Sequence, residues 1–218
     1  IGLLRGIPPS TVLSWWRGHP AGWWNPEDYG VASICVPIAT QVPHGAVRLY
    51  VMGERGARGA RATANDIDAM GRIARDAISA GALGFTTSRT TNHRTSRGEP
   101  TPTLRAADEE LIGIARAIGG AGVLQVVSDF GDLDAEFALM RAMVDASGCP
   151  LSISVAAENH RAPWFELRDR IAAAAGEGLP VRGQVGARAI GVLLGLETTF
   201  NPFSGAPAYR EVAGMPIA

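Results

Sequence analysis

The stretch GALGFTTSRTTNHRTSRGEPTPT, from Gly81 to Thr103, decides the expected fold of this 218-residue chain. It opens with a short, apolar and β-prone run at Ala82–Thr87 and continues as a long polar loop. Loops longer than about 12 residues are uncommon in compact domains and are usually functional or disordered. In parallel α/β proteins, ligands bind where such loops leave the carboxyl ends of strands. We therefore expect a strand followed by a functional loop, with a solvated surface loop as the alternative.

Strand-like and helix-like patterns alternate on both sides of this stretch. Parallel strands are predicted at Val47–Met52, Ala82–Thr87, Val123–Ser128, Leu151–Ala156 and Val181–Val185. Between them, apolar residues recur at helical spacing, and Thr63 with Asp66 resembles a capping box. This alternation predicts an α/β fold with right-handed crossovers, either an open doubly wound sheet or a (β/α)8 TIM-like barrel. Five units without obvious first and last elements look like the middle of a barrel.

The beginning of the chain does not follow this pattern. Residues 1–41 are rich in Trp, Pro and Gly, so an irregular connection is expected there. Residues 42–218 are expected to form a partial (β/α) barrel of about five βα units.

Composition limits the partners of the protein. A hydrophobic content of 46% and a net charge of -1 fit an ordinary soluble protein and give no attraction to nucleic acid or membranes. Cys35 and Cys149 are far apart and match no zinc-binding spacing, which favours reduced thiols and a cytoplasmic location. The chain contains no lysine, so all 20 basic residues are arginine. Recognition of an anion would therefore use arginine side chains or backbone N–H groups.

Four candidate substrate-binding residues follow three different predicted strands. They are Arg89, His93, Asp129 and Arg188. Because the loops after barrel strands share the carboxyl face, we expect these residues to converge on one rim. An arginine there could hold a substrate carboxylate bidentately, and His93 could orient a carbonyl or a leaving group. The alternative is that they are unrelated surface groups that neutralise nearby acids.

The histidines show no local metal-binding spacing. The chain has His19, His44, His93 and His160, but no HxH or HExxH motif, so no complete zinc site can be drawn. His160 follows the fourth predicted strand, at the same end as His93. His44 precedes the predicted strand Val47–Met52, at the opposite end, which favours a structural role.

Two stretches resemble the N-acyl-D-amino-acid deacylase, or D-aminoacylase-like, branch of the amidohydrolase superfamily: VPHGAVRLYVMGERG (Val42–Gly56) and DAISAGALGFTTSRTTNHRTSRGEPTPT (Asp76–Thr103). The resemblance continues through LQVVSDFGDLDAEF and IGVLLGLETTFNPFSGAPAYREVAGMP, and it spans Gln41 to Pro216. It implies a distorted (β/α)8 barrel of the metal-dependent hydrolase type. It also implies zinc-assisted hydrolysis of a non-peptide amide bond in a small molecule such as an N-acyl amino acid.

The chain departs from this family at the metal site. The HxH motif, the Gly-Asn-Cys-Gly stretch and the late aspartate of the family are not in the sequence, which would fit truncation at both ends. Two further family histidines correspond to Asp129 and Val155. The resemblance implies zinc as the metal of the family, but the zinc ligands are not present in this chain. Two hypotheses follow: a deacylase that uses a metal-activated water, or a catalytically inactive barrel kept as a binding or structural module.

Overall fold

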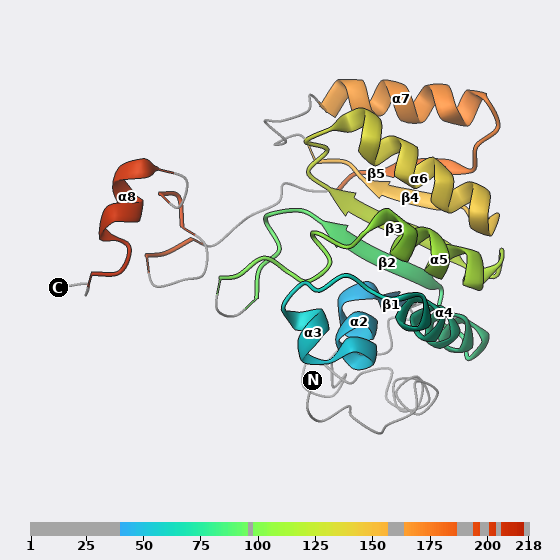
Figure 1. The fold of residues 1–218 in the computed structure, drawn as a ribbon. Coiled ribbons are helices and arrows are strands. Elements are labelled where there is room, and N and C mark those ends of the chain that lie inside the picture. The colour runs from blue at the N-terminus through green and yellow to red at the C-terminus, as the bar shows by residue number, and fades with distance from the viewer. Residues whose placement is uncertain are drawn as a thin grey trace, which may run out of the picture.

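A five-stranded sheet forms the centre of the protein (Figure 1). The computed structural model describes residues 40–95, 98–156, 164–186, 194–196, 201–203 and 206–215. The strands are β1 (Gln41–Pro43), β2 (Gly84–Arg89), β3 (Val123–Ser128), β4 (Leu151–Ser154) and β5 (Val181–Gln184). Every neighbouring pair is parallel, and the strand order is β1-β2-β3-β4-β5. The predicted parallel α/β fold, with strands in sequential barrel order, is confirmed.

A helix follows each strand, and most of the helices gather on one side of the sheet, while the last one lies apart from it (Figure 1). They are α2 (His44–Met52), α3 (Glu54–Ala57), α4 (Ala64–Ser79), α5 (Asp108–Ile118), α6 (Leu133–Ser147), α7 (Trp164–Gly176) and α8 (Pro207–Val212). Helix α4 packs against α5, and α5 packs against α6. Within the described ranges, none of the helices combines the length and the apolarity that a bilayer crossing requires.

The predicted strand at Val47–Met52 is wrong, because this segment lies in helix α2. Its buried residues His44, Val47, Arg48 and Met52 follow a helical spacing, so one face of α2 covers the start of the sheet. A short apolar run cannot be assigned to helix or strand by periodicity alone. Among the described residues, the first strand comprises only Gln41–Pro43. His44 therefore follows β1 at its carboxyl end, rather than preceding a strand at the opposite end.

The core lies between the sheet and the helices. One register row of the sheet consists of buried residues: Val42, Phe85, Leu124, Leu151 and Val181. The helices cover this row with buried apolar side chains, including Met70, Leu111, Ile114, Met140 and Met143. The free thiol of Cys149 is also buried.

The opposite side of the sheet is polar. We call it the open face, because its side chains are half-buried or exposed and the helices α4 to α7 lie on the other side (Figure 1). Its polar side chains are Thr86, Ser88, Gln125, Ser152, Ser154, Arg182 and Gln184.

Local signals set the helix ends as predicted. The Thr63 side chain accepts from the backbone of Asp66, and the Asp66 side chain accepts from the backbone of Thr63, so the capping box at the start of α4 is confirmed. Helices α5 and α6 both end at a glycine in the left-handed region, Gly119 and Gly148. Residues 1–39 lie outside the described part of the chain, so the expected irregular connection over residues 1–41 stays a prediction.

Candidate functional site

The end of β2 divides its side chains between the two faces of the sheet. Arg89 points into the helix layer and donates to Glu136 of α6. Ser88 lies on the open face, where its Oγ is 2.7 Å from Nδ1 of His93. Successive residues of a strand point to opposite faces, so this separation follows from the strand itself. Arg89 and His93 therefore share the carboxyl edge of β2 but face different sides of the sheet.

The Arg89 guanidinium is held by protein groups. Its Nε lies 2.8 Å from Glu136 Oε2, its Nη2 lies 2.8 Å from Glu136 Oε1, and its Nη1 donates to the Ala106 carbonyl at 3.0 Å. The Arg89 side chain is 14% exposed. This bidentate pair fastens β2 to α6 and to the end of the following loop. A substrate carboxylate at Arg89 would have to compete with Glu136.

Asp129 joins the loops that follow β2 and β3. Its Oδ2 accepts from the backbone N–H of Thr91 at 2.8 Å and from the Thr91 hydroxyl at 2.7 Å, while its Oδ1 accepts from the Thr90 hydroxyl. The next residue, Phe130, is buried and has a φ of 50°, which is uncommon for a residue other than glycine. Asp129 thus fixes the turn at Thr90–Thr91 against the end of β3.

The long loop after β2 folds back on itself. Arg94 and Pro100 form an antiparallel bridge, and the Thr95 N–H donates to the Glu99 carbonyl at 2.8 Å. Further along, the buried Thr103 hydroxyl donates to the Ser88 carbonyl at 2.7 Å. The described part of the loop therefore returns to the strand from which it started.

His93 is the predicted site residue that lies on the open face. Its ring is exposed, and Nδ1 contacts Ser88. Its Nε2 makes no hydrogen bond to any residue in the described ranges. Arg188 and His160 lie outside those ranges. The substrate-binding role of Arg89, His93, Asp129 and Arg188 stays a prediction.

Hydrogen bonds between side chains cross the open face from β2 to β5. The Thr86 hydroxyl donates to Gln125 Oε1, and Gln125 Nε2 donates to Ser154 Oγ at 2.8 Å. The Ser152 hydroxyl donates to Gln184 Oε1 at 3.1 Å. Barrel interiors are usually filled by branched apolar side chains, so this polar row is unusual. The sequence signal that could have revealed it is the polar–apolar alternation within the strands LQVVS and LSIS.

An arginine also lies on the open face. Arg182 of β5 pairs in register with Ser152 of β4, and its side chain is exposed. Its Nη1 donates to the Val181 carbonyl at 2.8 Å. Sequence reasoning missed this residue because the expected site comprised only residues in loops after the strands.

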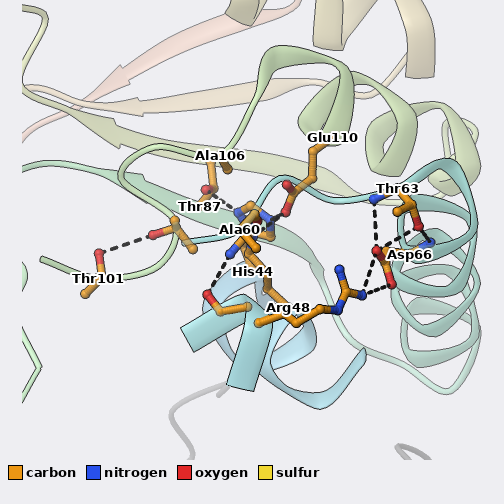
Figure 2. A network of polar contacts seen from close by, with 12 residues as sticks. His44, Arg48, Ala60, Thr63, Asp66, Thr87, Thr101, Ala106 and Glu110 are labelled. Carbon is orange, nitrogen blue, oxygen red and sulfur yellow. Dashed lines mark hydrogen bonds and ion pairs between the residues drawn. The ribbon is translucent and has the colours of Figure 1, made fainter. Parts of the chain in front are cut away.

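A buried polar network fills the space between β2, α2 and α5 (Figure 2). Glu110 Oε1 accepts from Arg48 Nε at 2.8 Å and lies 2.9 Å from His44 Nε2, while His44 Nδ1 lies 2.9 Å from Thr87 Oγ1. Arg48 also donates to the Gly56 carbonyl at 2.7 Å. Glu110 Oε2 is buried and has no hydrogen-bond partner among the described residues.

The environment of Glu110 stabilises its charged form. Burial favours the neutral acid, but the hydrogen bond from His44 and the guanidinium of Arg48 outweigh burial and hold the pKa of Glu110 below its ordinary value. At the start of α4, the backbone N–H of Thr63 is the main cause that lowers the pKa of Asp66; the Thr63 hydroxyl and Arg55 add to it against the effect of burial. Figure 2 shows the contacts between Thr63 and Asp66. Both carboxylates link elements of the fold, and neither lies on the open face.

The described residues do not fit a metal centre. No group of three or more His, Cys, Asp or Glu side chains in these ranges is placed to hold a metal ion. The oxygens of Asp129 already accept hydrogen bonds from Thr90 and Thr91. Val155, at the other position where the resemblance implies a ligand, has no atom that could coordinate a metal.

Comparison with known proteins agrees with the parallel sheet. A D-aminoacylase structure, concerned with the functional role of its binuclear metal centre, matches 69% of this chain with 25% identity and a TM-score of 0.53. Another, said to define a novel subset of amidohydrolases, matches 69% of the chain with 24% identity and a TM-score of 0.52, and this likeness shows the fold alone. The chain covers 30% of the length of each of these proteins.

Sequence comparison identifies the family. A search of curated protein sequences gives no match. The profile of the amidohydrolase family matches residues 15–217, which is nearly the whole chain. The chain therefore belongs to the amidohydrolase family.

Proposed function

We propose that the protein is a hydrolase of non-peptide amide bonds, with N-acyl amino acids or related small amides as its substrates. The single observation that carries this proposal is the position of His93. Ser88 holds its ring on the open face, at the carboxyl end of β2, and its Nε2 is left for a ligand. Active sites of barrel enzymes lie at this end of the strands. Membership in the amidohydrolase family and the likeness to D-aminoacylases support the reaction class.

The open face suits a small, polar substrate with a carboxylate. Its hydroxyl and amide groups both donate and accept hydrogen bonds, as an amide substrate requires. Arg182 is exposed there and could bind the carboxylate, while Arg89 is engaged with Glu136. The roles predicted for Arg89, His93, Asp129 and Arg188 belong to this proposal. In it, His93 Nε2 orients the scissile carbonyl or the leaving group.

The proposed reaction contains no step at a metal. The resemblance implies a zinc-activated water, and one of the similar D-aminoacylase structures has a binuclear metal centre. The described residues of this chain do not fit such a centre. The steps assigned to the chain itself are therefore binding at the open face and orientation of the amide by His93.

A second candidate function is a catalytically inactive barrel that binds ligands or has a structural role. The observation that favours it is the pair Asp129 and Val155, which replaces two histidines implied by the resemblance. Asp129 fixes a turn and Val155 cannot coordinate a metal. An inactive module with a binding role would bind its ligand at the open face without hydrolysing it.

The test is amine release from a panel of N-acyl-D- and N-acyl-L-amino acids, with metal content measured on the same samples. Turnover by the wild-type protein and its loss in His93→Ala would support the hydrolase. Arg182→Met should raise KM for substrates with a free carboxylate more than for their amides. Ser79→Ala, an exposed change at the end of α4, is the control that should retain activity. Absence of turnover with every substrate would favour the inactive module.

We also propose that the protein resides in the cytoplasm and acts on a small molecule rather than on nucleic acid or a membrane. The net charge of -1 and the buried free thiol of Cys149 support this assignment. Fractionation of cells that express the protein would test it, and recovery in the membrane fraction would contradict it.

A further inference from the structure

The Ser88–His93 contact carries an inference that deepens the proposed function and rests on it. The two side chains lie five residues apart, and their contact joins Ser88 Oγ to His93 Nδ1 at 2.7 Å. Ser88 belongs to β2, so the sheet fixes its position, whereas His93 belongs to the loop. A residue anchored in the sheet thus holds a ring that the loop alone would leave free to rotate.

The backbone on both sides of this contact is also fastened. Asp129 fixes Thr90 and Thr91, which lie between Ser88 and His93. The Thr103 hydroxyl binds the Ser88 carbonyl at 2.7 Å. These bonds bring the chain back over the open face within a few residues of the end of β2. These hydrogen bonds hold the turn in the conformation that brings the side chains of Ser88 and His93 together.

The chemistry of the contact distinguishes the two ring nitrogens. A neutral imidazole has one N–H donor and one acceptor nitrogen, and the hydrogen bond at one nitrogen decides which proton form is favoured. The Ser88 hydroxyl makes no other hydrogen bond within the described ranges. When that hydroxyl donates to Nδ1, the proton of the ring lies on Nε2.

We infer that Ser88 is a positioning residue, which holds His93 in the Nε2–H form so that Nε2 donates to the carbonyl oxygen of the bound amide. A donor aimed at this oxygen becomes more effective as negative charge develops on it during hydrolysis. Ser88 acts only through His93 and does not itself touch the substrate. The sequence gives no motif for such a pair, because Ser88 and His93 meet only through the turn held by Asp129.

The first test reads the ring directly and needs no enzymatic activity. Nitrogen-15 NMR of the imidazole rings, with His93 assigned from the spectrum of His93→Gln, distinguishes the protonated from the unprotonated nitrogen. In the wild-type protein with a neutral ring, Nε2 should carry the proton. Ser88→Ala should shift the ring toward a mixture of both forms, and Ser88→Thr, which keeps a hydroxyl, should restore the wild-type signal. A proton on Nδ1 in the wild type, or a spectrum unchanged by Ser88→Ala, would overturn the inference.

The second test is a double-mutant cycle on amide hydrolysis. Ser88→Ala should lower kcat/KM by about tenfold or more, since a misplaced group is less effective. His93→Gln keeps an N–H donor near the position of Nε2 but has no ring nitrogen at the position of Nδ1, where Ser88 makes its contact. Adding Ser88→Ala to His93→Gln should therefore cause no further loss, whereas two independent roles would give multiplied losses and contradict the inference. Ser79→Ala is the matched control outside the site.

The two tests separate two kinds of failure. Absence of turnover by the wild-type protein would contradict the proposed function, while the NMR measurement would still decide whether Ser88 fixes the ring. Normal turnover with an unchanged kcat/KM in Ser88→Ala would contradict the positioning role alone. Circular dichroism of each variant shows whether the fold is retained.

Discussion

Glu110 is a buried carboxylate whose removal should have a large effect on stability. It lies between His44 and Arg48, and both Arg48 and Glu110 have side chains that are 1% exposed. Glu110→Gln would leave the Arg48 guanidinium buried without an opposite charge, so we expect a loss of about 3–5 kcal/mol of unfolding free energy. Urea denaturation, monitored by circular dichroism, measures this loss of unfolding free energy.

The neighbouring residue offers a matched control. Glu109 has a side chain that is 67% exposed and pairs with Arg61 at the surface. Glu109→Gln should change the unfolding free energy by no more than about 0.5 kcal/mol. Equal effects of the two substitutions would show that burial of Glu110 does not determine its contribution.

The same carboxylate predicts how stability depends on pH. A folded-state pKa below the ordinary value of 4.5 means that Glu110 stabilises the fold above that pH. This contribution is lost as pH falls from about 4.5 through the lower folded-state pKa, and Asp66 acts in the same direction below its ordinary value of 3.8. Urea midpoints measured from pH 6 to pH 3 should change little above about pH 4.5 and fall below it. Glu110→Gln should flatten this fall, and an equally steep fall in the variant would contradict the assignment.

At the residue scale, contacts that lie within one turn of the chain were predictable. Thr63 and Asp66 form the expected capping box because both partners lie in one short segment. The partners of Arg89 and Glu110 were not predictable, because Glu136 and His44 come from helices far away in the sequence. Ion pairs of this kind depend on how the helices dock.

At the scale of elements, the crossing of α4 and α5 depends on the absence of a side chain. A Cβ atom added at Gly71 of α4 would lie 2.6 Å from the Cβ of Ala117 on α5. Gly71→Ala should therefore destabilise the protein by roughly 1–2 kcal/mol, since overpacking outweighs the better helix propensity of alanine. Thermal unfolding would show it as a lower Tm.

A second glycine provides the control for this crossing. Gly176 is the last residue of α7, and apart from its own helix no heavy atom of the described residues lies within 4 Å of an added Cβ. Gly176→Ala should be neutral or stabilising by up to about 1 kcal/mol. A similar loss of Tm in both variants would point to a general effect of alanine and not to the helix crossing.

Four of the five predicted strands match observed strands to within two residues, and one prediction was wrong. The strand Val123–Ser128 has the predicted bounds, and α5 ends at the predicted glycine. The segment Val47–Met52 was assigned to a strand because its apolar run fits both strand and helix. The segment is a helix because its buried face packs on the sheet, and this contact is not visible in the sequence.

At the scale of the whole molecule, we predict weak zinc binding, because the described residues include no metal-binding group. A catalytic zinc site needs about three protein ligands at one point, and no such group occurs in the described ranges. The 218-residue chain should retain well under one zinc per molecule after dialysis, as measured by inductively coupled plasma mass spectrometry. A known zinc enzyme taken through the same dialysis is the control. Stoichiometric zinc in the chain would contradict the prediction.

The fold was more predictable than the site. Alternation of strands and helices along the chain is enough to indicate a parallel sheet and its carboxyl edge. The side that each residue faces depends on where the strand begins and ends, which sequence patterns give only approximately. Arg89 and Ser88 differ by one position, and this one position separates the helix layer from the open face.

The strand order has a consequence for the way the protein forms. Each strand pairs with the one that comes next in the chain, and α4, α5 and α6 pack in the same order. During synthesis, a newly emerged strand–helix unit therefore finds its docking surface already made by the unit before it. The described sheet can grow on the ribosome from β1 toward β5, one unit at a time, without waiting for distant parts of the chain.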